Sequence, residues 1–179
     1  MQTSENVKMI ISEGDKKESL RVGQLIKKIE LINEKYVSEE SDIISQKQPF
    51  LISLILGWRF DLKPLELEEI MKVIFLIWEF FKKYHQTENA KITETQYMRI
   101  QQRNVHMLKY FEGEQSRNSK LEVISADLEN LKSKSLFTGI IFQFNQKVAL
   151  LNMKNETRGI ILVGLKSLIE SFEEIVNKS

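Results

Sequence analysis

Cysteine is absent from this sequence of 179 residues, and proline and glycine are scarce, with two and seven residues respectively. Without cysteine the chain has no disulfide bonds, zinc–thiolate centres or cysteine nucleophiles. Proline and glycine interrupt regular structure, so their scarcity favours long helices over a loop-rich β-sandwich. Pro49 and Pro64 both stand where a helix can begin, which is where proline does least harm. These features predict an all-α protein.

Neither sign of charge is in excess. Lysine and arginine number 26 against 25 aspartates and glutamates, which leaves a net charge of +1. This balance gives no overall field that would steer the protein onto nucleic acid or anionic lipid, so such binding would need a local patch. The first residues lack the basic and apolar segments of a signal peptide, so we expect a cytoplasmic protein.

Apolar residues recur every three or four positions in several segments, which is the spacing of amphipathic helices. Val22, Leu25, Ile29, Ile32 and Tyr36 form one such stripe. We expect helices over residues 17–37, 49–58, 62–84, 93–112, 120–134, 135–153 and 156–177, with a short helical turn after Ser38 as a further option.

Each stripe is short and is followed by a polar turn, so the pattern favours a globular bundle over a long coiled coil. We expect about six to seven helices in one domain over residues 17–179, after a flexible segment at 1–16. Residues 136–153 also fit a β-hairpin, because Ile140, Phe142 and Phe144 alternate with period two. The helical spacing covers more residues there, and both readings stay open.

The segment from Pro49 to His85 contains both tryptophans and much of the bulky apolar surface of the chain. A membrane-spanning helix needs about 18 uninterrupted apolar residues. Neither half of the segment has such a run, because charged residues interrupt it at Arg59, Asp61, Lys72 and Glu79. We therefore expect no membrane span.

Within this segment the polar residues of the expected helix fall on one narrow stripe, formed by Glu68, Lys72, Glu79 and Lys83. Almost every other residue from Ile70 to Phe81 is large and apolar. An apolar arc this wide contacts neighbours on most sides, which predicts a central and largely buried helix. Four aromatic residues are alternatively candidates for a subunit interface, where aromatic anchors are enriched: Trp58, Trp78, Phe81 and Tyr84.

No catalytic motif is present. The sequence has no Gly-x-Ser-x-Gly, P-loop or Gly-x-Gly-x-x-Gly, and no Glu-x-x-His of a di-iron bundle. His85 and His106 are too far apart for a paired metal site. Gly139, Gly159 and Gly164 lie within apolar helical patterns, which indicates close helix packing. We expect a protein that is not an enzyme, with no metal and no cofactor.

One local group of basic residues is a candidate for binding nucleic acid or phosphate. Arg99, Arg103, His106 and Lys109 share one face of the expected helix at 93–112. Such a strip can hold phosphates. The near-zero net charge favours the alternative, a solvated polar face.

The sequence thus predicts a non-enzymatic helical protein that acts by protein–protein association, as a homodimer, an adaptor or an immunity-type partner. One alternative is a bundle that binds a small apolar ligand in a pocket walled by Phe75, Trp78, Phe142 and Phe144. Another is nucleic-acid binding through the face from Arg99 to Lys109. No motif carries a resemblance to a known family.

Overall fold

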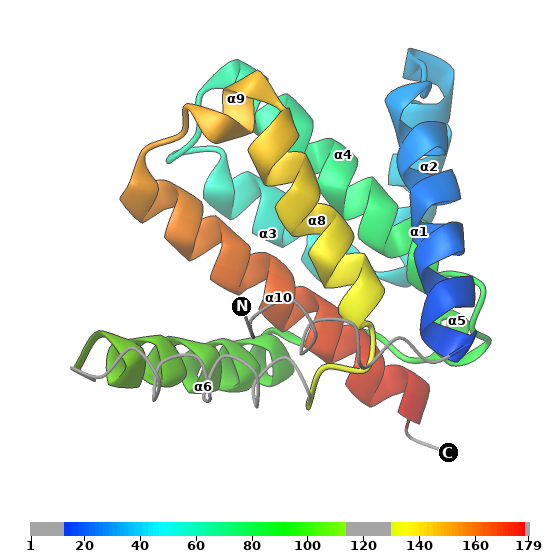
Figure 1. Cartoon of the computed structure of the whole chain (residues 1–179). Coiled ribbons are helices and arrows are strands. Elements are labelled where there is room, and N and C mark those ends of the chain that lie inside the picture. The colour runs from blue at the N-terminus through cyan, green and yellow to red at the C-terminus, as the bar shows by residue number, and fades with distance from the viewer. Residues whose placement is uncertain (1–12, 114–129, 178–179) are drawn as a thin grey trace.

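A computed structural model describes residues 13–113 and 130–177 of the chain. Within these ranges every element is a helix, which confirms the all-α class (Figure 1). The helices are α1 (Glu13–Glu30), α2 (Glu34–Lys47), α3 (Pro49–Trp58), α4 (Pro64–Phe81), α5 (Gln86–Asn89), α6 (Glu94–Gly113), α8 (Lys134–Gln146), α9 (Val148–Leu151) and α10 (Asn155–Asn177). No described helix is long and apolar enough to cross a membrane.

The most deeply buried run of the described chain lies on α4. Every residue from Val73 to Phe81 is buried, including Glu79. α4 packs against α1, α3, α8, α9 and α10, while α6 lies at the lower left and packs against α10 (Figure 1). Burying one large apolar side chain contributes about 2 kcal/mol, so α4 is a principal source of the stability of the fold.

The helix expected over residues 17–37 is wrong, because the chain divides there into two helices. α1 ends at Glu30, and Asn33 caps α2 by accepting a hydrogen bond from the backbone N–H of Tyr36 at 2.9 Å. An asparagine at this position satisfies one of the free N–H groups at a helix start. α2 then continues to Lys47, well beyond the short turn expected after Ser38. α1 also includes residues 13–16, which were expected to be flexible.

The segment 136–153 is helical and not a β-hairpin, but its helix is interrupted. Lys147 adopts an extended backbone between α8 and α9. Its ammonium group pairs with Glu30 of α1 at 2.8 Å. The helix expected over 120–134 lies almost entirely outside the described residues. The expected helices over 17–37 and 135–153 are each divided in two, and α5 was not expected. The described helices therefore outnumber the six or seven expected.

Of the three glycines predicted to allow close helix packing, two do so. A Cβ atom on Gly139 would lie 2.8 Å from Val22 where α8 meets α1. A Cβ atom on Gly164 would lie 2.5 Å from the indole of Trp58 where α10 meets α3. The packing interpretation is wrong for Gly159, whose Cβ position is open.

A buried amide joins the start of α3 to α5 and to the segment that follows α5. The side chain of Gln48 donates to the carbonyls of Thr87 and Ala90, at 2.9 and 2.7 Å. Its oxygen accepts the N–H of Ile92 at 2.9 Å. Gln48 is fully buried, so these bonds satisfy backbone groups that water cannot reach.

Candidate functional site

The aromatic residues predicted as interface anchors lie mostly in the core. Trp58, Trp78 and Phe81 are buried within the chain, and Tyr84 is partly buried. Phe81 stacks on Phe172 of α10 with ring centroids 4.8 Å apart. The first three side chains therefore leave little surface for a partner to cover.

The polar stripe of α4 does not face solvent at Glu79. The side chain of Glu79 is 4% exposed and pairs with Lys28 of α1 at 2.9 Å and with Lys82 at 2.6 Å. It also accepts a hydrogen bond from the hydroxyl of Tyr36 on α2. Burial opposes the charge of Glu79, but the hydrogen bonds from Lys82, Tyr36 and Lys28 lower the pKa of this carboxyl group. Glu79 thus joins α1, α2 and α4.

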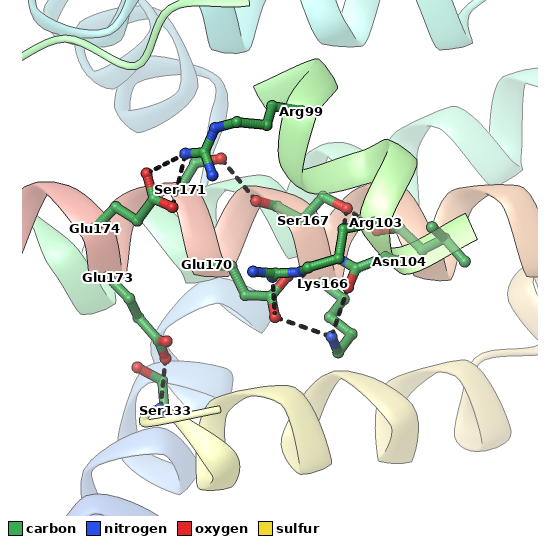
Figure 2. Close-up of polar contacts among 11 residues, drawn as sticks. Arg99, Arg103, Asn104, Ser133, Lys166, Ser167, Glu170, Ser171, Glu173 and Glu174 are labelled. Atoms are coloured by element: carbon green, nitrogen blue, oxygen red, sulfur yellow. Dashed lines mark hydrogen bonds and ion pairs between the residues drawn. The ribbon is translucent and has the colours of Figure 1, made fainter. Parts of the chain in front are cut away.

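The predicted basic face of α6 is largely neutralised by acidic residues of α10 (Figure 2). Arg99 donates two hydrogen bonds to Glu174 at 2.8 and 2.7 Å, and Arg103 pairs with Glu170 at 2.9 Å. His106, further along the same helix, is exposed. Lys109 is exposed as well. The structure therefore brings the two arginines to α10 rather than presenting four basic groups to a phosphate.

Beneath these ion pairs lies a buried polar group that the sequence patterns did not reveal (Figure 2). Asn104 donates to Ser167 at 2.9 Å and to Glu170 at 2.6 Å. Lys166 donates to the side-chain oxygen of Asn104 at 3.0 Å and to Glu170 at 2.9 Å. In the sequence, this group could have been suspected from Lys166, a single lysine within the apolar run from Ile160 to Ile169. The three contacts of Asn104 in this group join α6 to α10.

Two carboxylates from other helices meet the start of α8. Glu173 of α10 accepts the backbone N–H of Ser133 at 2.6 Å. Burial raises the pKa of Glu173, although hydrogen bonds from Ser133 and from the backbone of Lys132 act to lower it. Burial also raises the pKa of Glu18 on α1, which accepts a hydrogen bond from the backbone of Ser135. No group of three or more acidic or histidine residues in the described ranges could hold a metal ion.

The four aromatics expected to wall an apolar pocket do not share one. Phe75 lines a groove between α2 and α4, and Phe142 lines a separate groove between α1 and α8. Trp78 and Phe144 are buried in the core. The geometry thus gives no support to a ligand pocket built from these residues.

A different surface combines a hollow with exposed apolar side chains. The turn between α3 and α4 meets the segment that joins α9 to α10 at one end of the molecule (Figure 1, upper left). Here residues 60–63 and Glu66 face residues between Met153 and Ile161 across a hollow of about 590 Å³. We call these lining residues the end surface. Its apolar members include Phe60, which is 89% exposed, and Ile160, which is 55% exposed.

The exposure of Phe60 follows from the way its turn is held. The preceding Trp58 is buried against Gly164, and its carbonyl accepts the N–H of Asp61 at 3.0 Å. On the other side, the backbone N–H of Lys63 donates to the side chain of Glu66 at 2.9 Å, which caps α4. With both ends of the turn fixed, the ring of Phe60 is held outside the core.

Other exposed apolar residues lie on the elements that end or begin next to this surface, and of the six named below only Phe60 and Ile160 line the hollow. Six of the twelve large apolar side chains exposed in the described ranges lie on α3, the α3–α4 turn, the first turn of α4, α9 or the first part of α10: Leu56, Phe60, Leu65, Val148, Leu151 and Ile160. Concentrations of exposed apolar surface mark interaction sites more often than isolated residues do. Sequence spacing did not identify Phe60, because periodicity assigns no face to a residue in a turn.

Comparison with known proteins shows no matching family model, no match among curated proteins and no match among solved structures.

Proposed function

We propose that this protein is not an enzyme and acts by binding another protein chain through the end surface. The observation that carries the proposal is the ring of Phe60, 89% exposed beside a hollow of about 590 Å³. A large aromatic side chain at the centre of an interface commonly supplies much of the binding free energy.

The fixed turn supports this role of Phe60. Binding is weakened by the entropy lost when mobile side chains and loops become ordered. Because Trp58 and Glu66 hold the two sides of the turn, much of that ordering is complete before a partner arrives. The lining of the hollow also includes four charged residues, namely Asp61, Lys63, Lys154 and Glu156. Protein interfaces combine apolar contacts with polar and charged groups.

The two alternative functions have weaker support. Nucleic-acid binding through α6 would use Arg99 and Arg103, but both already pair with carboxylates of α10. Binding an apolar ligand among Phe75, Trp78, Phe142 and Phe144 would need a shared pocket. Phe75 and Phe142 line separate grooves, and Trp78 and Phe144 are buried in the core.

Affinity purification from the cells in which the protein is native tests the proposal. A tagged wild-type chain is compared with Phe60→Ser and with a matched control, Leu31→Ser, which alters another residue that is 84% exposed. We expect the wild type and Leu31→Ser to retain the same bound chain and Phe60→Ser to lose it. Equal retention by all three proteins would contradict the proposal. Circular dichroism establishes that each variant keeps its helical content.

A further inference from the structure

The end surface presents a projection and a hollow side by side. Phe60 extends from the α3–α4 turn and also forms part of the wall of the hollow, opposite Ile160 and Ile161. The volume of about 590 Å³ lies within the range that accommodates small organic groups, so an aromatic ring fits. A surface with both features can bind a copy of itself, because each copy offers a ring and receives one.

The charges of the end surface are of both signs. Asp61, Lys154 and Glu156 are exposed, and none of them forms an ion pair within the described part of the chain. Lys63 pairs with Glu66 at 3.6 Å. A partner surface of a single sign would place like charges opposite some of these residues, which weakens binding. A rotated copy of the same surface can set Lys154 opposite an acidic residue of the other copy.

From these observations we infer that the partner at the end surface is a second copy of this chain, related by a two-fold axis, with each Phe60 ring in the hollow of the other copy. In such an interface the same surface is used twice, so every contact occurs in two equivalent forms. The net charge of +1 means that two copies approach without appreciable long-range repulsion. This inference rests on the proposed function, and it specifies that the chain bound at the end surface is a second copy of this protein.

The molar mass in solution tests the inference. Light scattering after gel filtration, over a series of concentrations, should give the wild type twice the 21.1 kDa of one chain. Phe60→Ser removes two equivalent contacts from each dimer and should raise the dimer dissociation constant at least about a hundredfold. Leu31→Ser should leave the constant unchanged. A wild type that stays at the mass of one chain up to its solubility limit would overturn the inference.

Mixing two variants tests the reciprocal geometry. Phe60→Ser lacks the ring and loses one part of the hollow wall, but it keeps the rest of that wall, including Ile160 and Ile161. Ile160→Lys puts a charge into the hollow wall but keeps the ring. Each variant alone loses both contacts, while the mixed dimer retains one. We therefore expect the mixture to associate more tightly than either variant alone. A mixture that associates no more tightly than its components would overturn the two-fold arrangement.

The two proposals fail in different ways. A monomeric wild type whose captured partner is still lost on Phe60→Ser would overturn the second copy as occupant and leave the end surface as a binding site. A dimer whose dissociation constant is unaffected by Phe60→Ser would overturn the inference. If Phe60→Ser also retains every captured chain, the proposed function fails with it.

Discussion

Glu173 on α10 accepts the backbone N–H of Ser133, 40 residues earlier in the chain, at 2.6 Å. The bond satisfies a free N–H at the start of α8 with a carboxylate from another helix. Glu79 has the opposite electrostatic balance, because Lys82, Tyr36 and Lys28 all favour its charged form. These two buried carboxyl groups therefore respond to pH in opposite directions.

Replacing Glu173 should change how stability depends on pH. Because burial raises the pKa of Glu173, the folded chain binds the proton more tightly than the unfolded chain. The stabilising contribution of this group is complete below the usual carboxyl pKa of about 4.3 and is lost as the pH rises through the folded pKa. We expect the free energy of unfolding of the wild type, minus that of Glu173→Gln, to fall from acid toward neutral pH in urea titrations.

Replacing Glu79 should give the opposite trend. Hydrogen bonds from Lys82, Tyr36 and Lys28 lower the pKa of Glu79 despite its burial. Its contribution is present above about pH 4.3 and is lost as the pH falls through the folded pKa. The free energy of unfolding of the wild type, minus that of Glu79→Gln, should therefore rise from acid toward neutral pH. Parallel pH profiles for the two variants would show that the charge assignments are incorrect.

Gln48→Ala should destabilise the fold by about 3 kcal/mol. The substitution leaves the carbonyls of Thr87 and Ala90 and the N–H of Ile92 without the amide that now bonds to them. Gln46→Ala is the matched control, because Gln46 is exposed on the same stretch of chain. Urea denaturation measures both values, and equal midpoints for the two variants would contradict the role assigned to Gln48.

Two glycines of α10 should respond to alanine with opposite signs. Gly164→Ala places a Cβ atom 2.5 Å from the indole of Trp58 and should cost about 2 kcal/mol. Gly159→Ala meets open space and should stabilise the protein by about 0.5 kcal/mol or more, since alanine favours the helix. Thermal unfolding of the pair should give a lower and a higher midpoint than the wild type. A shift of the same sign for both variants would contradict the packing at Trp58.

Asn104→Ala should loosen α6 from α10. The substitution removes an acceptor from Lys166 and a donor to Ser167 and Glu170, all in a poorly hydrated region. We expect a loss of about 2 kcal/mol and faster hydrogen exchange along α6. Gln102→Ala, at an exposed position of the same helix, should change the stability by less than about 0.5 kcal/mol. Unchanged exchange in Asn104→Ala would argue against this contact between the helices.

The sequence patterns were sufficient to predict helices whose ends are marked by clear residue signals. The spacing and Pro49 predicted α3 with its observed bounds. The stripe from Val22 to Tyr36 was misleading, because apolar residues continue at helical spacing across the break at residues 31–33. Asn33 was a usable capping signal. The break at Lys147 had no such signal, because no glycine or proline stands there to mark the interruption of the helix.

The candidate site was less predictable than the fold. A bulky apolar residue has the same pattern whether its own chain or a partner covers it, so Trp78 and Phe81 could not be assigned to core or interface. The pairing of Arg99 with Glu174 joins residues 75 positions apart, which spacing along a helix cannot reveal. The end surface likewise forms only when the α3–α4 turn meets the start of α10.

Site-specific photocrosslinking can locate the binding surface. A photoreactive phenylalanine analogue at position 60 is compared with the same analogue at position 31, whose side chain is almost equally exposed. Irradiation should join position 60 to another protein chain, at residues of the facing hollow if that chain is a second copy, and should give no such product from position 31. Crosslinks from position 31 alone, or equal yields from both positions, would contradict a binding surface built around Phe60.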